Sequence, residues 1–192
     1  SFSCNCSTNA GAMQPDTLRA CEGTTLTVSP AAIPAVLDAN DVTAWVLHSG
    51  SGPALGQVFA QNTTGQFGFV TGMNYGQTYF ISLVAGNPSN GFPDPADPCF
   101  SVATGQPVVF FKNPAPNAGP DAAVCGKTAG LQAVASGYSG NWSFVSGPGT
   151  ATFSNGNSSN GQVTVSAFGT YIFKWTETNV ICQGEDQVSI SF

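Results

Sequence analysis

The sequence predicts an all-β protein made of two immunoglobulin-like antiparallel β-sandwich domains in tandem. The 192 residues include 23 Gly and 13 Pro, and only 7% are charged, so turns are frequent and the strongest helix formers are scarce. Between the turns lie short segments in which apolar and polar residues alternate, as in half-buried strands. Prolines at alternate positions of the segment 113–117 divide the chain in two. Hydrophobic residues make up 42% of the chain, which is enough for a core despite the low charge.

The clearest strand is predicted at Gly169–Thr176. Tyr171, Phe173 and Trp175 occupy alternate positions there, so their side chains share one face. We expect this strand to lie in the core of the second domain. A counterpart in the first half, Tyr79–Ala85, carries apolar residues on both faces, and we expect any contact with a neighbouring domain or subunit there.

The first domain is predicted over residues 1–112. It opens with a cysteine-rich segment, residues 1–23, for which we expect irregular structure. Further along, β-branched and aromatic residues run between turn residues, which is typical of strands. The strands are predicted at 24–29, 42–48, 57–61, 67–71, 79–85 and 108–112.

A proline-rich linker is predicted at residues 113–117, because alternating prolines favour a stiff, extended polyproline segment. A smaller immunoglobulin-like sandwich should follow over residues 118–192. Asn117-Ala118-Gly119 repeats Asn9-Ala10-Gly11, and a Cys follows each, which indicates a weak internal repeat. Strands of the second domain are predicted at 131–135, 141–146, 150–153, 162–167, 170–178 and 187–192.

The charge excludes several classes of partner. The chain has four Lys and Arg residues and ten Asp and Glu residues, so its net charge is −6, and it has no basic cluster. We therefore expect no binding to nucleic acid or to an anionic membrane. No apolar run approaches the ~20 residues of a membrane-spanning helix, so no membrane insertion is expected. The sequence starts at Ser1, with no starting Met and no signal peptide, so it is expected to be a mature chain or an excised fragment.

Six cysteines spread along the chain indicate disulfides and an oxidising compartment outside the cytoplasm. Cys125 and Cys182 are the only two in the second domain, so we expect them to pair. Cys21 is expected to pair with Cys99 by analogy, although four cysteines allow three pairings. Cys4 and Cys6 then remain, and because a bond between such near neighbours would be strained, one of them is expected to reach a neighbouring domain or loop.

Two acidic clusters are candidate calcium ligands. Asp38 and Asp41 form the first cluster, and Asp94 and Asp97 form the second. Carboxylate oxygens suit Ca²⁺, but neither cluster fits an EF-hand loop. The alternative is that these residues serve turns and caps. Zinc is not expected, because the sequence has one His and no C-x-x-C pair.

Catalytic residues are not expected, and the chain is predicted not to be an enzyme. His48 has no acid or nucleophile near it in sequence, and no hydrolase, metalloprotease or phosphate-loop motif is present. Trp45, Trp142 and Trp175 are candidates for a sugar-binding face. Each lies in an alternating strand, which favours a role in core packing instead.

Three stretches of the second domain resemble repeats of very large surface proteins of Bacteroidota. They are Asn117-Ala-Gly-Pro-Asp with Val124-Cys-Gly, Gly140-Asn-Trp-Ser-Phe-Val-Ser-Gly-Pro-Gly-Thr, and Gly169-Thr-Tyr with Phe173-Lys-Trp-Thr. In the first domain, Leu37-Asp-Ala-Asn-Asp-Val and Val46-Leu-His-Ser-Gly-Ser-Gly are similar to the module that often accompanies them. The family is that of PKD-like or immunoglobulin-like repeats of gliding-motility-associated adhesins.

The resemblance implies tandem β-sandwich repeats, export by the type IX secretion route, and a role as a stalk or adhesive layer at the bacterial cell surface. It implies no catalytic residues. Asp16-Thr17-Leu18 is similar to an O-glycosylation site of such bacteria, so Thr17 is predicted to carry a glycan.

The leading expectation is therefore a non-enzymatic extracellular segment, structural or adhesive, whose partners are neighbouring repeat domains or identical subunits. One alternative is a filament subunit that polymerises by strand addition at an exposed sheet edge. The other alternative is a carbohydrate-binding module that recognises surface glycans.

Overall fold

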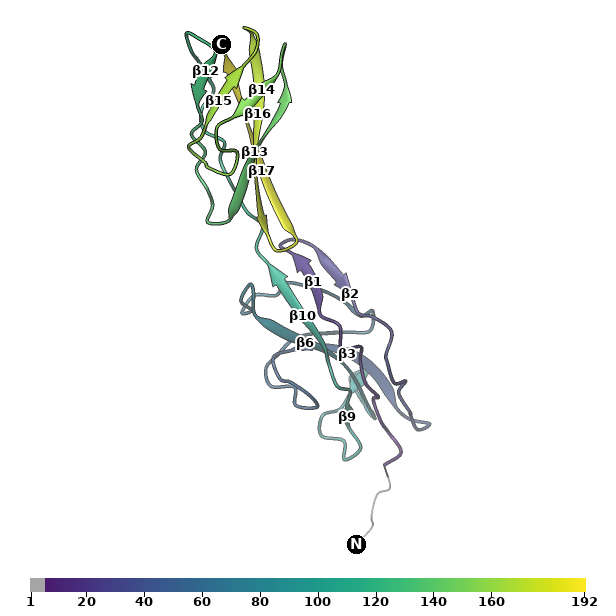
Figure 1. Ribbon diagram of the computed structural model, residues 1–192. Coiled ribbons are helices and arrows are strands. Elements are labelled where there is room, and N and C mark those ends of the chain that lie inside the picture. Colours follow the sequence, from purple (N-terminus) through teal and green to yellow (C-terminus); the bar gives the residue numbers. More distant parts are fainter. Residues whose placement is uncertain (1–5) are drawn as a thin grey trace. The chain divides into compact units, whose positions relative to one another are not determined.

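The computed structural model describes residues 6–192, and every regular element in this range is a β-strand (Figure 1). The chain divides into two compact units, with the boundary between Phe111 and Lys112. We call them unit one and unit two. The prediction of an all-β chain with two immunoglobulin-like sandwich domains in tandem is confirmed. Within the described residues, no helix is long and apolar enough to cross a membrane.

Unit one is built around one large sheet. Antiparallel pairing joins most of its strands, but its first strand pairs in parallel with its last. The order is β1 (Leu18–Cys21), β10 (Gln106–Phe111), β6 (Thr78–Gly86), β3 (Val42–His48) and β4 (Val58–Asn62), with β9 (Ser101–Val102) also on β6. Two short pairs complete the unit: β2 (Thr25–Thr27) with β5 (Gln66–Gly68), and β7 (Pro88–Ser89) with β8 (Phe92–Pro93).

The central strand β6 is buried on both faces, as its sequence predicts. On one face, Tyr79 and Ile81 belong to the main core of the unit. On the other, Val84 packs with Ala44 and Val46, and partly buried side chains of the same unit, Phe92 among them, cover this cluster. The second apolar face is therefore largely covered by side chains of the same unit.

Unit two is a sandwich of two sheets around one core. Its strongest strand, β16, alternates as predicted, and Tyr171, Phe173 and Trp175 are each no more than 2% exposed. One sheet has the order β11 (Ala122–Ala123), β17 (Cys182–Ser191), β16 (Thr170–Asn179) and β13 (Ser139–Ser146). The other has the order β12 (Thr128–Gly130), β15 (Gln162–Val165) and β14 (Ala151–Phe153).

Strand β1 lies in a segment for which we expected irregular structure, and no strand was predicted at β11. The predicted strand at 131–135 is only a single bridge between Val134 and Asn117. The proline-rich segment 113–117 lies against unit two: Ala115 N donates a hydrogen bond to Ser136 Oγ (3.1 Å). Part of the expected spacer is thus packed on the second sandwich.

Candidate functional site

The opening and closing segments of unit one run side by side in the same direction. Residues 6–22 form the opening segment and residues 99–111 form the closing one. We call this pair of segments the terminal seam of unit one. Their contacts keep a nearly constant separation in sequence, which is 93 residues at Cys6–Cys99, 91 at Ala10–Ser101 and 90 at Asp16–Gln106.

Contacts bind the two segments of the seam along their whole length. At the end nearest Lys112, β1 and β10 pair in register from Leu18–Val108 to Cys21–Phe111. The fully buried Gln106 binds the middle of the seam, since its Nε2 donates to Asp16 O, and its Oε1 also accepts from Ser29 N (3.0 Å) in the intervening chain. The main inter-segment hydrogen bonds run from Ala10 N to Ser101 Oγ (2.9 Å), Met13 N to Thr104 O (2.8 Å), Gln106 Nε2 to Asp16 O (3.2 Å) and Glu22 N to Phe111 O (2.8 Å).

Unit two has a terminal seam of the same design, between residues 117–124 and residues 186–192. Strand β11 pairs in parallel with the end of β17. Two carboxylates add side-chain bonds: Ala118 N donates to Asp186 Oδ2 and Ser189 N donates to Asp121 Oδ1, each at 2.8 Å and each 68 residues apart in sequence. The parallel pairing of first and last strands is therefore common to both units.

The repeated Asn-Ala-Gly tripeptide begins both seams and adopts the same structure in each. Asn9 exchanges main-chain hydrogen bonds with Val36, and Asn117 does so with Val134. In both copies the Asn Oδ1 accepts from the Gly N at 2.8 Å. The Ala side chains are 0% and 1% exposed. The weak repeat in the sequence thus marks a structural repeat.

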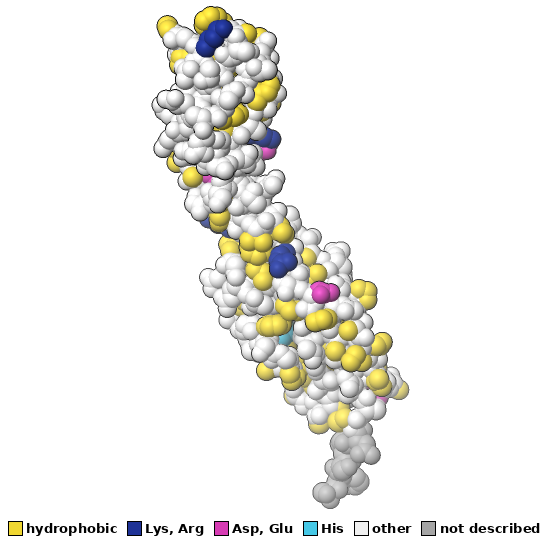
Figure 2. Space-filling view, in the orientation of Figure 1, with side chains coloured by type: hydrophobic (Ala, Val, Ile, Leu, Met, Phe, Trp, Pro, Cys, Tyr) yellow, Lys and Arg dark blue, Asp and Glu magenta, His cyan; other side chains and the backbone are white. Residues whose placement is uncertain are grey.

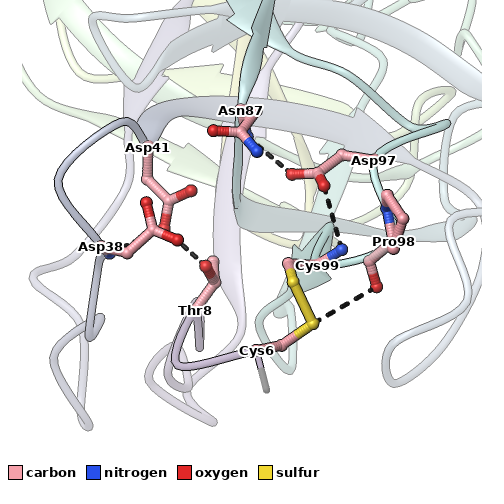
Figure 3. Close-up of a disulfide and its surroundings, with 8 residues drawn as sticks. All are labelled: Cys6, Thr8, Asp38, Asp41, Asn87, Asp97, Pro98 and Cys99. Atoms are coloured by element: carbon pink, nitrogen blue, oxygen red, sulfur yellow. Dashed lines mark hydrogen bonds between the residues drawn. A yellow bond between two sulfur atoms is a disulfide. The ribbon is translucent and has the colours of Figure 1, made fainter. Parts of the chain in front are cut away.

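A disulfide closes the far end of the unit-one seam, between Cys6 and Cys99, with an S–S distance of 2.06 Å (Figure 3). The predicted pairing of Cys21 with Cys99 is therefore wrong. The predicted pairing of Cys125 with Cys182 is also wrong, because Cys125 is an exposed free cysteine. Cys21 and Cys182 are both disulfide-bonded. Cys4 lies outside the described residues, and its pairing stays a prediction.

Asp97 fixes the loop that carries Cys99 (Figure 3). Its carboxylate accepts hydrogen bonds from Asn87 N (2.7 Å) and from Cys99 N (3.1 Å). These main-chain bonds, that from Asn87 foremost, hold the pKa of the Asp97 carboxyl below its ordinary value. Asp94 forms a local turn instead, since its Oδ1 accepts from Ala96 N (2.9 Å).

Asp38 and Asp41 lie at the same end of unit one as the disulfide (Figure 3). Asp41 Oδ2 accepts from Thr8 Oγ1 (2.6 Å) and from Asp38 N (2.9 Å), so it ties the opening segment to the loop before β3. Asp38 Oδ1 accepts from Asn40 N (3.0 Å). All four Asp residues proposed as calcium ligands thus make turn or cap bonds. Among residues 6–192, no three His, Cys, Asp or Glu side chains come together in a group that could hold a metal ion.

His48 is fully buried between β3 and β6. Its Nδ1 lies 3.0 Å from Leu55 O and its Nε2 lies 2.8 Å from Ser82 Oγ. Because a carbonyl can only accept, the neutral ring carries its proton on Nδ1, and Ser82 donates to Nε2. Burial lowers the pKa of the imidazole, and the bond to Leu55 only partly opposes this. His48 is a satisfied core residue with no access to a substrate.

Glu177 is the buried carboxylate of unit two. It accepts hydrogen bonds from Ser136 and from Trp175 Nε1 (2.9 Å). Burial by itself would raise the pKa of this carboxyl, but the bonds from Ser136, Trp175 and the Tyr138 main chain outweigh it and hold the pKa below its ordinary value. This cluster could not be predicted from the sequence, because the alternating strand pattern marks position 177 only as inward-facing.

An open groove of about 720 Å³ lies beside this cluster in unit two, lined by uncharged polar residues that include Asn141 and Asn157. Trp142 and Trp175 form part of its wall, but they are only 4% and 2% exposed. Neither ring presents a face for stacking on a sugar. In unit one, Trp45 is partly buried and packs against two core clusters. Core packing is confirmed for the two tryptophans of unit two.

The surface around these features carries little charge, and the view in Figure 2 shows only scattered Lys, Arg, Asp and Glu side chains. An ion pair joins Lys174 Nζ to Glu185 (2.8 Å). Thr17, the predicted glycan carrier, is exposed directly before β1.

No family model matches the chain, and no curated protein matches it. Similar solved structures include the Drosophila OTK extracellular domains 3–5 (10% identity, TM-score 0.31), human CDH23 EC21-23 (12%, 0.37) and fibronectin(III)-like modules of Clostridium thermocellum CbhA (15%, 0.35). These matches cover 96%, 95% and 96% of this chain, and 65%, 69% and 90% of the other chains. At such TM-scores nothing about the function of this chain follows from them.

Proposed function

We propose that this chain is a non-enzymatic extracellular segment of a bacterial surface protein and acts as a stalk or filament building block. One observation carries the proposal: both units are built on the same terminal seam, which begins with the same Asn-Ala-Gly turn. A unit whose first and last strands pair in parallel receives the chain at one end and releases it at the other, which suits a repeat in a series.

The resemblance to gliding-motility-associated repeats supports a bacterial cell surface as the location and the type IX route as the means of export. The Cys6–Cys99 disulfide supports an oxidising compartment. The partners in this proposal are neighbouring repeat domains. Thr17 carries an O-linked glycan, which intact-mass measurement of the native chain would detect and which Thr17→Ala would remove.

A replacement experiment in the source bacterium tests the structural role. Deleting the two units from the gene should weaken adhesion of the cells to a surface, and inserting two unrelated β-sandwich domains of matched length should restore it. Antibodies to the chain should label intact cells. If matched domains fail to restore adhesion, the chain has a specific binding role and the stalk proposal is wrong.

The filament alternative makes a different prediction in solution. A stalk segment should stay monomeric as its concentration rises in sedimentation velocity, whereas a self-assembling subunit should form a growing series of larger species. Growth of such a series would favour strand addition at a sheet edge over the stalk.

The carbohydrate-binding alternative has one observation in its favour, the uncharged polar groove of unit two. Binding on a glycan array that Tyr138→Ala abolishes, with the fold intact, would support it. The inward-facing tryptophans argue against it, because stacking on a sugar ring requires an exposed aromatic face.

A further inference from the structure

We propose that the terminal seam of unit one, closed by Cys6–Cys99, carries tensile load past the body of the unit. The inference deepens the proposed stalk function and rests on it. In this arrangement residues 23–98, which contain β2 to β8, form a body that lies outside the path of the force.

The direction of the two segments is the first reason. The opening segment runs from Cys6 to Cys21 and the closing segment runs beside it from Cys99 to Phe111, in the same direction. A pull on the chain before Cys6 and after Phe111 would therefore slide the segments past each other. Such a pull loads the hydrogen bonds of the seam together, whereas an antiparallel hairpin pulled at its two ends opens one bond at a time.

The position of the disulfide is the second reason. Cys6 lies at the start of the seam, so tension that reaches it passes through the S–S bond directly to Cys99. From Cys99 it continues along the closing segment, much of which is already extended as β9 and β10. The loop of chain between the two cysteines is bypassed, and it cannot be drawn out while the bond is closed.

The third reason is a disulfide at the other end of the opening segment, at Cys21. Cys21 is the last residue of β1 and is itself disulfide-bonded. Tension that stays in the opening segment therefore also meets a covalent bond before it reaches residue 22.

Asp97 and Asp41 stabilise the end of the seam that carries the Cys6–Cys99 disulfide. Asp97 binds the main chain at both Asn87 and Cys99, and Asp41 binds Thr8 just after Cys6 (Figure 3). The two irregular segments that carry the cysteines are thereby tied to loops before β3 and after β6. These bonds position the cysteines opposite each other.

Single-molecule force spectroscopy on the whole oxidised chain tests the inference. One handle is attached before Cys6 and the other at the exposed side chain of position 112. Between these handles the wild-type chain should lengthen very little, because the segment 99–111 spans only about 45 Å when fully extended. The triple variant Cys6→Ser/Cys21→Ser/Cys99→Ser, which removes both covalent bonds of the seam segments, should instead show an unfolding step several times longer.

Cys125→Ser is the matched control, because this cysteine is free, exposed and in unit two. It should behave as the wild type does between these handles. A long step in the oxidised wild-type chain would overturn the inference whether or not the triple variant folds. A triple variant that folds but lengthens no more than the wild type would also overturn it. Neither result would affect the adhesion experiment, so failure of the load path and failure of the stalk function are distinguishable.

Discussion

Gly11 and Gly119 occupy equivalent positions at the start of the two seams. Both have positive φ angles, +78° and +89°. A Cβ atom would lie 2.0 Å from Ile33 O at Gly11 and 2.6 Å from Gln132 O at Gly119. Only glycine relieves both the steric cost of the left-handed backbone and the contact with a main-chain oxygen.

Gly119→Ala should therefore lower the free energy of unfolding of unit two by about 2 kcal/mol or more, through backbone strain. Urea titration followed by tryptophan fluorescence measures it, because Trp142 and Trp175 lie in this unit. Gly130→Ala is the control, since Gly130 has open space around it and no positive φ. Equal midpoints for the two variants would contradict the assignment of strain to the Asn-Ala-Gly turn.

His48 predicts a pH dependence of unit one. Its pKa in the folded chain lies below the ordinary value of about 6.5, because burial disfavours the charged ring. As the pH falls below that value the unfolded chain binds more protons than the folded one, so the free energy of unfolding decreases. Above it, His48 is neutral in both states and the contribution is constant.

NMR titration of the imidazole protons measures this pKa, and the assignment is immediate because the chain has one His. The midpoint should lie lower in the native chain than in the same chain unfolded in urea. A native midpoint equal to or above the unfolded one would mean that the ring is not held neutral in the core.

At the scale of elements, the β16–β17 hairpin has an unusual turn. Its two turn residues are Val180 and Ile181, between the paired residues Asn179 and Cys182. Val180 has a φ of +57°, which a β-branched residue rarely adopts. A positive φ at the first turn position is the sign found in type II′ turns, where glycine is usual.

Val180→Gly should thus stabilise unit two by about 1 kcal/mol, because glycine removes the steric cost of the positive φ. The measurement is the shift of the urea midpoint. Ile181→Ala serves as the control and should change the midpoint little, since Ile181 is 51% exposed and has no positive φ. Destabilisation by Val180→Gly would show that packing of the valine side chain outweighs its backbone strain.

The strands that sequence predicts best are those with strong alternation. The segments 42–48 and 170–178 coincide closely with β3 and β16, because their apolar faces are set by local pattern alone. Strands β1 and β11 were not predicted. Their sequences, Leu-Arg-Ala-Cys and Ala-Ala, alternate weakly, and they are strands only because a partner far along the chain runs beside them.

The disulfides could not be predicted for the same reason. Pairing by analogy assumed that the two domains form disulfides between cysteines at matching places in their sequences. The pairing depends instead on the seam, which places Cys6 opposite Cys99, so Cys99 is not available to Cys21. The Asn-Ala-Gly repeat was visible in the sequence, but its role as the start of a parallel seam depends on residues about 70 to 90 positions away.

At the scale of the whole molecule, the small net charge determines how readily the chains associate in solution. The net charge is −6 at pH 7 and the isoelectric point is about 4.2. Light scattering of the purified chain should therefore rise as the pH approaches 4.2 and fall again when the pH is returned to 7, because electrostatic repulsion between molecules is smallest near zero net charge. A scattering maximum near neutral pH would point instead to specific association.

The terminal seam also affects how the number of residues in such units can change during evolution. Within a unit, the distance between the points where the chain arrives and departs is fixed by the seam, and the intervening residues contribute nothing to it. Seam contacts join residues 90 positions apart in unit one and 68 apart in unit two, so unit one has more residues between its seam segments. Insertions there would enlarge the body of a repeat and leave its spacing along the chain unchanged, so selection can vary the exposed surface without altering the reach of the protein.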